Sequence, residues 1–115
     1  MHLPVVYPRP LKNDANVVVI SPSSPQREDA FLQAGIDWFR QRGYQVTEGS
    51  SLWHRHGYLA GADTERLEEL NSALQDPTVD LIVAGRGGYG AGRILEGIDY
   101  EAARRNRPII LGFSD

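Results

Sequence analysis

Three glycines in G-x-G-x-x-G spacing, Gly85, Gly87 and Gly90, follow an apolar run and precede a segment with helical character. This spacing is typical of a turn that holds the pyrophosphate of a dinucleotide, with an acidic residue about 20 positions further on. Asp115 meets the second condition. The motif normally occupies the first strand-to-helix turn, however, and that turn reads SPSSP at residues 21–25, without glycine. A non-catalytic nucleotide-binding or dinucleotide-binding module therefore stays open as one interpretation.

Ser114 suggests a different chemistry, because it follows the last predicted strand. A serine on a sharp turn after a strand is exposed as a nucleophile, and the N–H of the next residue, here Asp115, faces the oxyanion that forms. The same residues could equally form an ordinary turn or a helix cap. Gly87 and Gly88 would then serve another purpose, since residues without side chains let a backbone N–H approach negative charge developing near Ser114.

Arginine and histidine side chains supply the other candidates. The planar guanidinium of Arg86 matches a substrate carboxylate, although a surface ion pair explains it equally well. His54 and His56 form an H-x-H pair in the long loop at residues 49–61. No acidic residue or cysteine stands at ligand spacing from this pair, so we interpret both as solvated loop residues and expect no metal site.

Short buried runs alternate with helical stripes along the chain, and this alternation predicts the elements that position these residues. We expect strands at residues 17–20, 44–48, 79–84 and 108–112, helices at 26–42, 63–75 and 100–105, and a further helical piece at 91–95. The fold class is therefore α/β, with three layers and a mainly parallel sheet between helices on both faces, of the Rossmann-like or flavodoxin-like kind.

The first two helices carry more specific expectations. Asp63 is expected to cap the second helix, and Gly43 to end the first. The first helix is expected to face the core with a wide stripe made of two rows, Phe31, Ala34 and Trp38, and Leu32, Ile36 and Phe39.

Composition excludes several classes of function. The 115 residues predict one domain, with an irregular, proline-rich lead-in at 1–16 and an α/β domain at 17–115. A formal charge of −3 gives no basic surface for nucleic acid or an anionic membrane. There is no cysteine, and no apolar run approaches the ~20 residues of a membrane span. We expect a cytoplasmic protein that binds neither nucleic acid nor membrane.

Five stretches taken in order resemble the N-terminal half of the LD-carboxypeptidase family, serine peptidases that include microcin-immunity-type members. The stretches are residues 21–24 (SPSS), 57–61 (GYLAG) with Asp63 and Arg66, 86–90 (RGGYG), 98–100 (IDY) and 112–115 (GFSD). The resemblance implies cleavage of the amide between an L- and a D-residue in cytoplasmic murein peptides, during cell-wall recycling. It also implies that no metal or cofactor is needed.

The same resemblance assigns roles to residues at the predicted site. Ser114 would be the nucleophile, and the N–H groups of Asp115 and of Gly87 or Gly88 would form the oxyanion hole. Arg86 and Tyr89 would contact the substrate. The family's histidine and glutamate belong to a C-terminal domain that this chain does not include, so we expect the chain alone to be inactive. We also expect it to self-associate as a homodimer, and a purely structural, self-associating fragment is a further alternative.

Overall fold

The structure is a computed structural model that describes residues 4–24, 29–53, 62–112 and 114. Its regular elements are strands β1 (Asn16–Ile20), β2 (Gln45–Glu48), β3 (Leu81–Ala84) and β4 (Ile109–Leu111), α-helices α1 (Asp29–Gln41), α2 (Asp63–Gln75) and α3 (Tyr100–Asn106), and 3-10 turns η1 (Ser50–Trp53), η2 (Ala91–Arg93) and η3 (Leu95–Gly97). The expected α/β alternation is confirmed.

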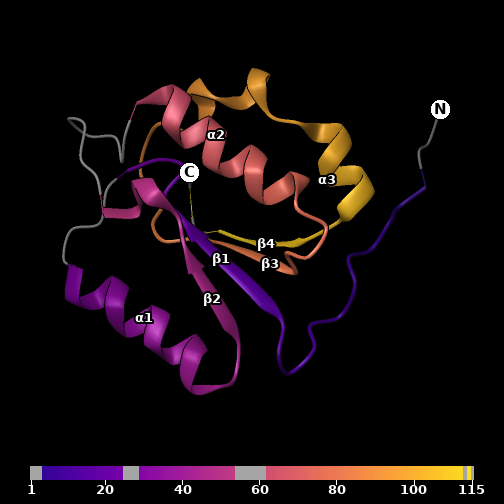
Figure 1. Cartoon of the computed structure of the whole chain (residues 1–115). Coiled ribbons are helices and arrows are strands. Elements are labelled where there is room, and N and C mark those ends of the chain that lie inside the picture. Colours follow the sequence, from indigo (N-terminus) through magenta and orange to yellow (C-terminus); the bar gives the residue numbers. More distant parts are fainter. Residues whose placement is uncertain (1–3, 25–28, 54–61, 113, 115) are drawn as a thin grey trace.

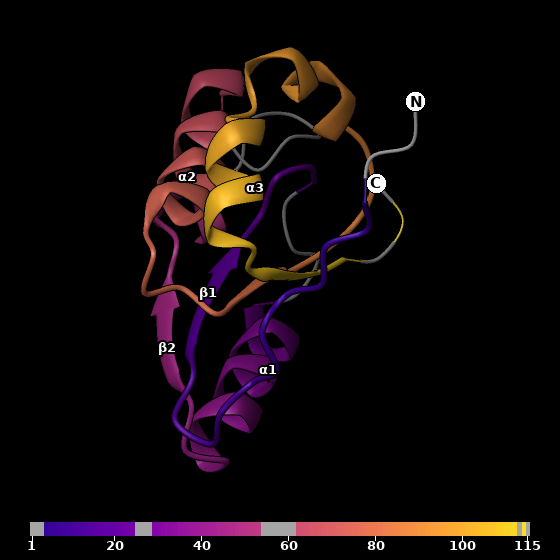
Figure 2. The same ribbon diagram turned by 90° about the vertical axis from the view of Figure 1, so that its right-hand side faces the viewer.

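The described strands form one parallel sheet in the order β2-β1-β3-β4. Helix α1 covers one face, while α2 and α3 cover the other (Figures 1 and 2). The chain leaves β1 for α1 and the β2 edge, then crosses back through α2 to reach β3 on the other side of β1. The three-layer architecture with helices on both faces is therefore confirmed, and β1 is its central strand.

Strand β1 contributes to a separate apolar core on each face of the sheet. Val17 and Val19 pack in the core beneath α1, whereas Val18 and Ile20 pack in the core beneath α2 and α3. Successive side chains of a strand point to opposite faces, so an unbroken β-branched run is what a strand covered on both sides requires. This pattern places β1 in the interior of the sheet.

The wide stripe expected on α1 is only half correct. Leu32 and Ile36 are buried and Phe39 is half-buried against the sheet, but Phe31 is 73% exposed and Trp38 49% exposed. Residues one position apart on a helix lie about 100° apart, so the row of Phe31, Ala34 and Trp38 points along the flank of the helix. Trp38 instead stacks under the Arg42 guanidinium, 3.6 Å from its ring centroid.

One local expectation about a helix end is wrong. Ala62, not Asp63, occupies the N-cap of α2, and Asp63 is the first helical residue, with its carboxylate turned to arginine side chains. The helical piece expected at 91–95 is present as the two 3-10 turns η2 and η3 and not as an α-helix. Glycine is a poor helix former, and Gly90, Gly92 and Gly97 punctuate this segment.

Helix α3 has the ends that the sequence favours. Asp99 caps it by accepting the Ala102 N–H at 2.9 Å, and Arg104 and Arg105 are exposed in its last turn. Asn106 is buried and donates to the Leu74 carbonyl at 2.8 Å, which ties α3 to α2. The helix thereby fixes the point from which β4 begins.

Candidate active site

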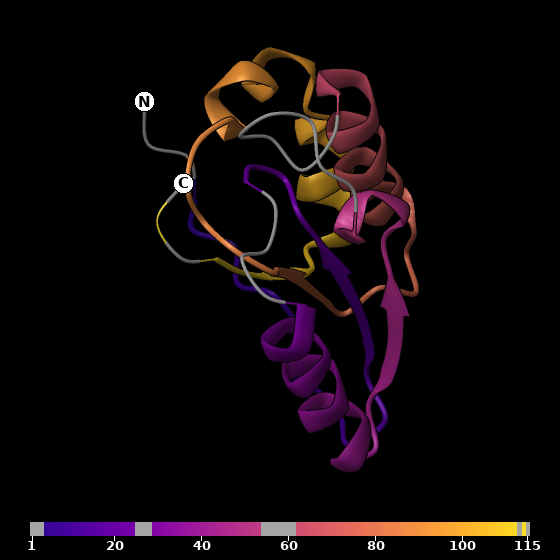
Figure 3. The ribbon, with the colours of Figure 1, turned by 90° about the vertical axis from the view of Figure 1, so that its left-hand side faces the viewer.

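The segments that follow β1 and β3 leave the sheet at the same end and then diverge to opposite faces (Figure 3). The chain after β1 runs to α1, and the chain after β3 runs through η2 and η3 to α3. Such a topological switch point is where open parallel sheets bind ligands, because the diverging loops leave a crevice. In the described residues, the SPSS segment and the glycine loop, residues 85–90, meet here.

Ser24 joins the two loops. Its hydroxyl accepts the Tyr89 N–H at 3.0 Å and donates to the Tyr89 carbonyl at 3.4 Å. Gly88 lies against the same hydroxyl, and a Cβ on Gly88 would stand only 2.2 Å from Ser24 Oγ. Gly88 also has φ +109°, which L side chains rarely adopt. Only glycine fits this position without moving the loop.

Arg66 of α2 forms a second connection between the loops. Its side chain is fully buried, and Nη1 donates to the Pro22 carbonyl at 2.5 Å and to the Gly90 carbonyl at 2.8 Å. Nη2 donates to the Asp63 carboxylate one helical turn away. The guanidinium therefore links the loop after β1, the loop after β3 and the start of α2.

Asp63 balances the buried charge of Arg66 and also accepts hydrogen bonds from a second arginine. Arg93 Nε donates to Asp63 Oδ1 at 3.0 Å and to Oδ2 at 3.2 Å. The hydrogen bond from Arg93, with smaller contributions from its charge and from Arg66, lowers the pKa of Asp63 below its usual 3.8. The carboxylate is thus held ionised between two guanidinium groups.

The glycine loop leaves two backbone donors without acceptors. Within the part of the chain that the structure describes, the N–H groups of Gly87 and Gly88 donate to no acceptor, whereas the Tyr89 N–H is bound to Ser24. Gly87 is buried, Arg86 is half-buried, and Tyr89 is 75% exposed at the tip of the loop. Two adjacent free donors beside an arginine form a suitable environment for a negatively charged oxygen.

Ser114 follows β4, the strand that pairs with β3. Val83 of β3 pairs with Leu111 of β4, and Arg86 and Ser114 each lie three residues further on. Ser114 is exposed and has φ +61°, a left-handed conformation that non-glycine residues seldom adopt. The β3–β4 pairing meets the condition on which the expected juxtaposition of the two segments rests. A serine in such a conformation at a strand end matches a nucleophile elbow.

Asp115, a predicted site residue, lies outside the described part of the chain, and so do His54 and His56, the histidines interpreted as solvated loop residues. In the ranges that the structure does describe, no group of three or more His, Cys, Asp or Glu side chains is arranged to hold a metal ion. Among these same residues, no helix combines the length and apolar character that a membrane crossing needs.

The structure also weakens the dinucleotide interpretation of the glycine motif. A pyrophosphate site of that kind uses the N-terminus of an α-helix that begins at the glycines. Here Gly90 leads into the three-residue turn η2, which supplies no such helix end. The close approach of Gly88 to Ser24 gives the glycines a different structural purpose.

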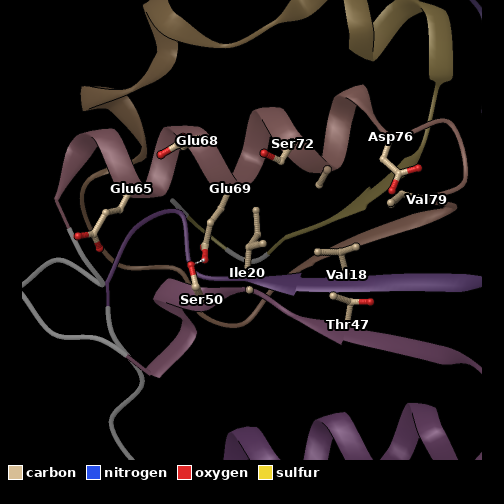
Figure 4. Close-up of a pocket in the computed structure, with 12 residues that line it drawn as sticks. Val18, Ile20, Thr47, Ser50, Glu65, Glu68, Glu69, Ser72, Asp76 and Val79 are labelled. Atoms are coloured by element: carbon tan, nitrogen blue, oxygen red, sulfur yellow. Dashed lines mark hydrogen bonds between the residues drawn. The ribbon is translucent and has the colours of Figure 1, made fainter.

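A groove that sequence patterns did not indicate lies between α2 and strands β1 and β2 (Figure 4). Its volume is about 420 Å³, and Glu65, Glu68, Glu69 and Asp76 contribute carboxylates to its lining. Glu69 accepts a hydrogen bond from Ser50 at 2.8 Å. Carboxylates would repel the terminal carboxylate of a peptide, so the glycine loop suits such a ligand better than this groove does.

These features define an α/β domain with a glycine loop at a topological switch point and a serine after the neighbouring strand. The chain matches the model of the LD-carboxypeptidase N-terminal domain over residues 17–115. It belongs to the LD-carboxypeptidase family, which confirms the resemblance drawn from its motifs.

Similar proteins agree with this assignment. The chain is 38% identical over 94% of its length to a Bacillus subtilis protein named as a probable murein peptide carboxypeptidase, and covers 34% of it. A muramoyltetrapeptide carboxypeptidase from Oxalobacter formigenes has a TM-score of 0.76, with 29% identity, over 88% of this chain and 33% of that one. The microcin C7 self-immunity protein MccF with aspartyl sulfamoyl adenosine has a TM-score of 0.88, with 25% identity, over 96% and 33%. The chain spans about a third of the length of its curated relatives.

Proposed function

We propose that this chain is the nucleophile-bearing part of a serine carboxypeptidase that hydrolyses the L,D-amide bond of murein peptides. The observations that support this most directly are the left-handed backbone of Ser114 after β4 and, after the neighbouring strand β3, the N–H groups of Gly87 and Gly88, which have no acceptor among the described residues. The names of the relatives agree with a murein peptide substrate. The proposed setting is the recycling of cell-wall peptides in the cytoplasm.

The proposed mechanism assigns a step to each group. The Ser114 hydroxyl attacks the carbonyl carbon of the scissile amide, and its proton passes to a histidine base supplied from outside this chain. The carbonyl oxygen becomes an oxyanion that accepts the N–H of Gly87 or Gly88 and of Asp115. The base then protonates the departing amine, and water hydrolyses the acyl-enzyme. Arg86 pairs with the terminal carboxylate, and the exposed Tyr89 contacts the peptide.

Reconstitution tests this proposal. The 115-residue chain alone should release no D-amino acid from an L,D-tetrapeptide, because a serine without a base is a poor nucleophile at neutral pH. Mixing it with the separately expressed remainder of a family member should restore cleavage. Ser114→Ala should then lower kcat by about 10⁴-fold or more, while Ser72→Ala, at an exposed serine of α2, should leave it unchanged. Normal cleavage by the Ser114→Ala pair would remove Ser114 from the role of nucleophile.

We also propose that the isolated chain forms a homodimer. Strand β4 ends the sheet, and Ile110 and Leu111 are 59% and 53% exposed on it. An uncovered apolar edge strand is a template for pairing with another chain. Light scattering should show a dimer whose population rises with concentration, and Ile110→Lys should shift it toward monomer. A monomer over the whole concentration range would contradict the proposal.

A further inference from the structure

We infer that Arg66 is a positioning residue, which holds the glycine loop in the conformation that presents the N–H groups of Gly87 and Gly88. The inference rests on the proposed function for its catalytic meaning, but its structural content is independent of any reaction. Arg66 lies on α2 and acts through the backbone of two loops, without contact to the reacting atoms.

Arg66 holds the two loops together by hydrogen bonds to a backbone carbonyl of each, and we call this set of bonds the clamp. A single nitrogen, Nη1, donates to the carbonyl of Pro22 in one loop and to that of Gly90 in the other. The arginine side chain has no exposed surface, so water is excluded from the place where it meets the two carbonyls. Without Arg66, each carbonyl would lose this hydrogen bond with no water to replace it. The clamp therefore fixes the distance between the two loops at the point where they diverge.

The glycine loop depends on such a restraint more than most loops do. Gly88 and Gly90 have φ of +109° and +124°, and glycine loses more conformational freedom on ordering than any other residue. Ser24 restrains the loop at Tyr89, and Arg66 restrains it at Gly90. Gly87 and Gly88 come directly before these two attachment points, so the direction of their N–H groups is set by both.

Only arginine suits this position. Its planar fork offers five donors, and here two nitrogens serve two carbonyls and a carboxylate at once. A lysine ammonium is a single point of charge and cannot reach all three acceptors from the same stem. Lysine at this position should keep the charge next to Asp63 and lose the link between the loops.

Hydrogen exchange on the 115-residue chain tests the clamp directly. Arg66→Lys should speed exchange of the Tyr89 N–H by about tenfold or more relative to the Gly85 N–H, which bonds to the Ile20 carbonyl at 2.7 Å within the sheet. Ile36→Val, which removes a buried methylene on the opposite face, should leave the ratio of the two rates unchanged. Equal acceleration of Tyr89 and Gly85 in Arg66→Lys, or none, would overturn the inference.

A kinetic readout distinguishes positioning from general destabilisation. In the reconstituted pair, Arg66→Lys should lower kcat by about 10²-fold with KM within about twofold, because misplaced oxyanion donors affect the transition state more than substrate binding. An unchanged kcat would overturn the catalytic part of the inference.

Two other outcomes have their own reading. If the wild-type pair shows no cleavage, the proposed function fails, and the ratio of the Tyr89 and Gly85 exchange rates alone decides whether Arg66 holds the loop. If Arg66→Lys does not fold, Asp63→Asn should raise the same ratio, and an unchanged ratio would overturn the inference.

Discussion

Ser24 and Tyr89, separated by 65 positions in the sequence, exchange two hydrogen bonds through one hydroxyl group. Gly88 lies directly against that hydroxyl, with no space for a side chain. The pair makes the conformation of the glycine loop dependent on the segment that follows β1. It therefore connects the fold of the sheet to the backbone N–H groups of Gly87 and Gly88.

Gly88→Ala should damage this connection. The new Cβ would meet Ser24 Oγ at 2.2 Å and would impose a positive φ on alanine. We expect a loss of about 1–3 kcal/mol in the free energy of unfolding and a shifted Tyr89 amide resonance. Gly92→Ala is the matched control, because a Cβ there has no atom of the described residues within 4 Å. Denaturant titration should place Gly92→Ala within about 0.5 kcal/mol of wild type; equal stability of the two variants would contradict the steric explanation.

Two buried serines of the SPSS segment should respond differently to alanine. Among the described residues, Ser21 Oγ is the buried side-chain atom without a hydrogen-bond partner, whereas Ser24 has partners at Tyr89. Ser24→Ala should lower the free energy of unfolding by about 0.5–1.5 kcal/mol, while Ser21→Ala should be neutral or stabilising. Thermal or urea unfolding of both variants measures this. A larger loss for Ser21→Ala would mean that its hydroxyl has a partner outside the described residues.

Asp63 should make the domain sensitive to acid. Its pKa in the folded state is lowered, chiefly by Arg93, so the unfolded state takes up the proton first as pH falls. The contribution is therefore fully present above the unfolded value near 3.8 and is lost as pH falls through the lower folded pKa. The difference in unfolding free energy between wild type and Asp63→Asn should be constant near neutral pH and shrink below pH 3.8.

A second variant separates the effect of Arg93 on the pKa of Asp63 from that of Arg66. Arg93→Gln removes the largest contribution, so the carboxyl carbon of Asp63 should titrate at higher pH in NMR spectra than it does in wild type. An unchanged midpoint would assign the lowered pKa to Arg66 instead.

Gly35→Ala should stabilise the protein. Gly35 lies in the middle of α1 and is exposed, and no atom in the described part of the chain would lie within 4 Å of a Cβ there. Alanine is about 1 kcal/mol more favourable than glycine inside a helix, so the melting temperature should rise. Ala34→Gly, one position away and also exposed, is the reverse control and should lower it by a similar amount. A loss of stability in Gly35→Ala would show that this part of α1 is packed.

Local patterns were sufficient for the layers of the fold but not for the contacts within the site. The β-branched run at Val17–Ile20 can be satisfied only by a strand covered on both faces, so its place could be predicted. The flank position of Phe31 could not, because helical periodicity gives the angle between residues and not the width of the surface that the helix covers.

For the site, the sequence predicts what depends on strand order. Ser114 and Arg86 follow strands that are neighbours and parallel, as expected, and their proximity stays a prediction from that topology. Ser24 and Arg66 belong to motifs visible in the sequence, but their partners, Tyr89 and Gly90, lie on a segment brought close only by the crossover through α2. Contacts between residues so far apart in the sequence cannot be predicted from the spacing of residue types.

The strand order β2-β1-β3-β4 also has a kinetic consequence. β1, α1 and β2 are consecutive and can associate early, whereas β3 must pass over β1 before it pairs. Closing this long segment carries an entropic penalty before any contact compensates for it, which slows folding. The Ser24–Tyr89 bonds should therefore form after the rate-limiting step, with a φ-value near zero for Ser24→Ala. A nascent chain emerging from the ribosome would acquire its first strands well before its active site.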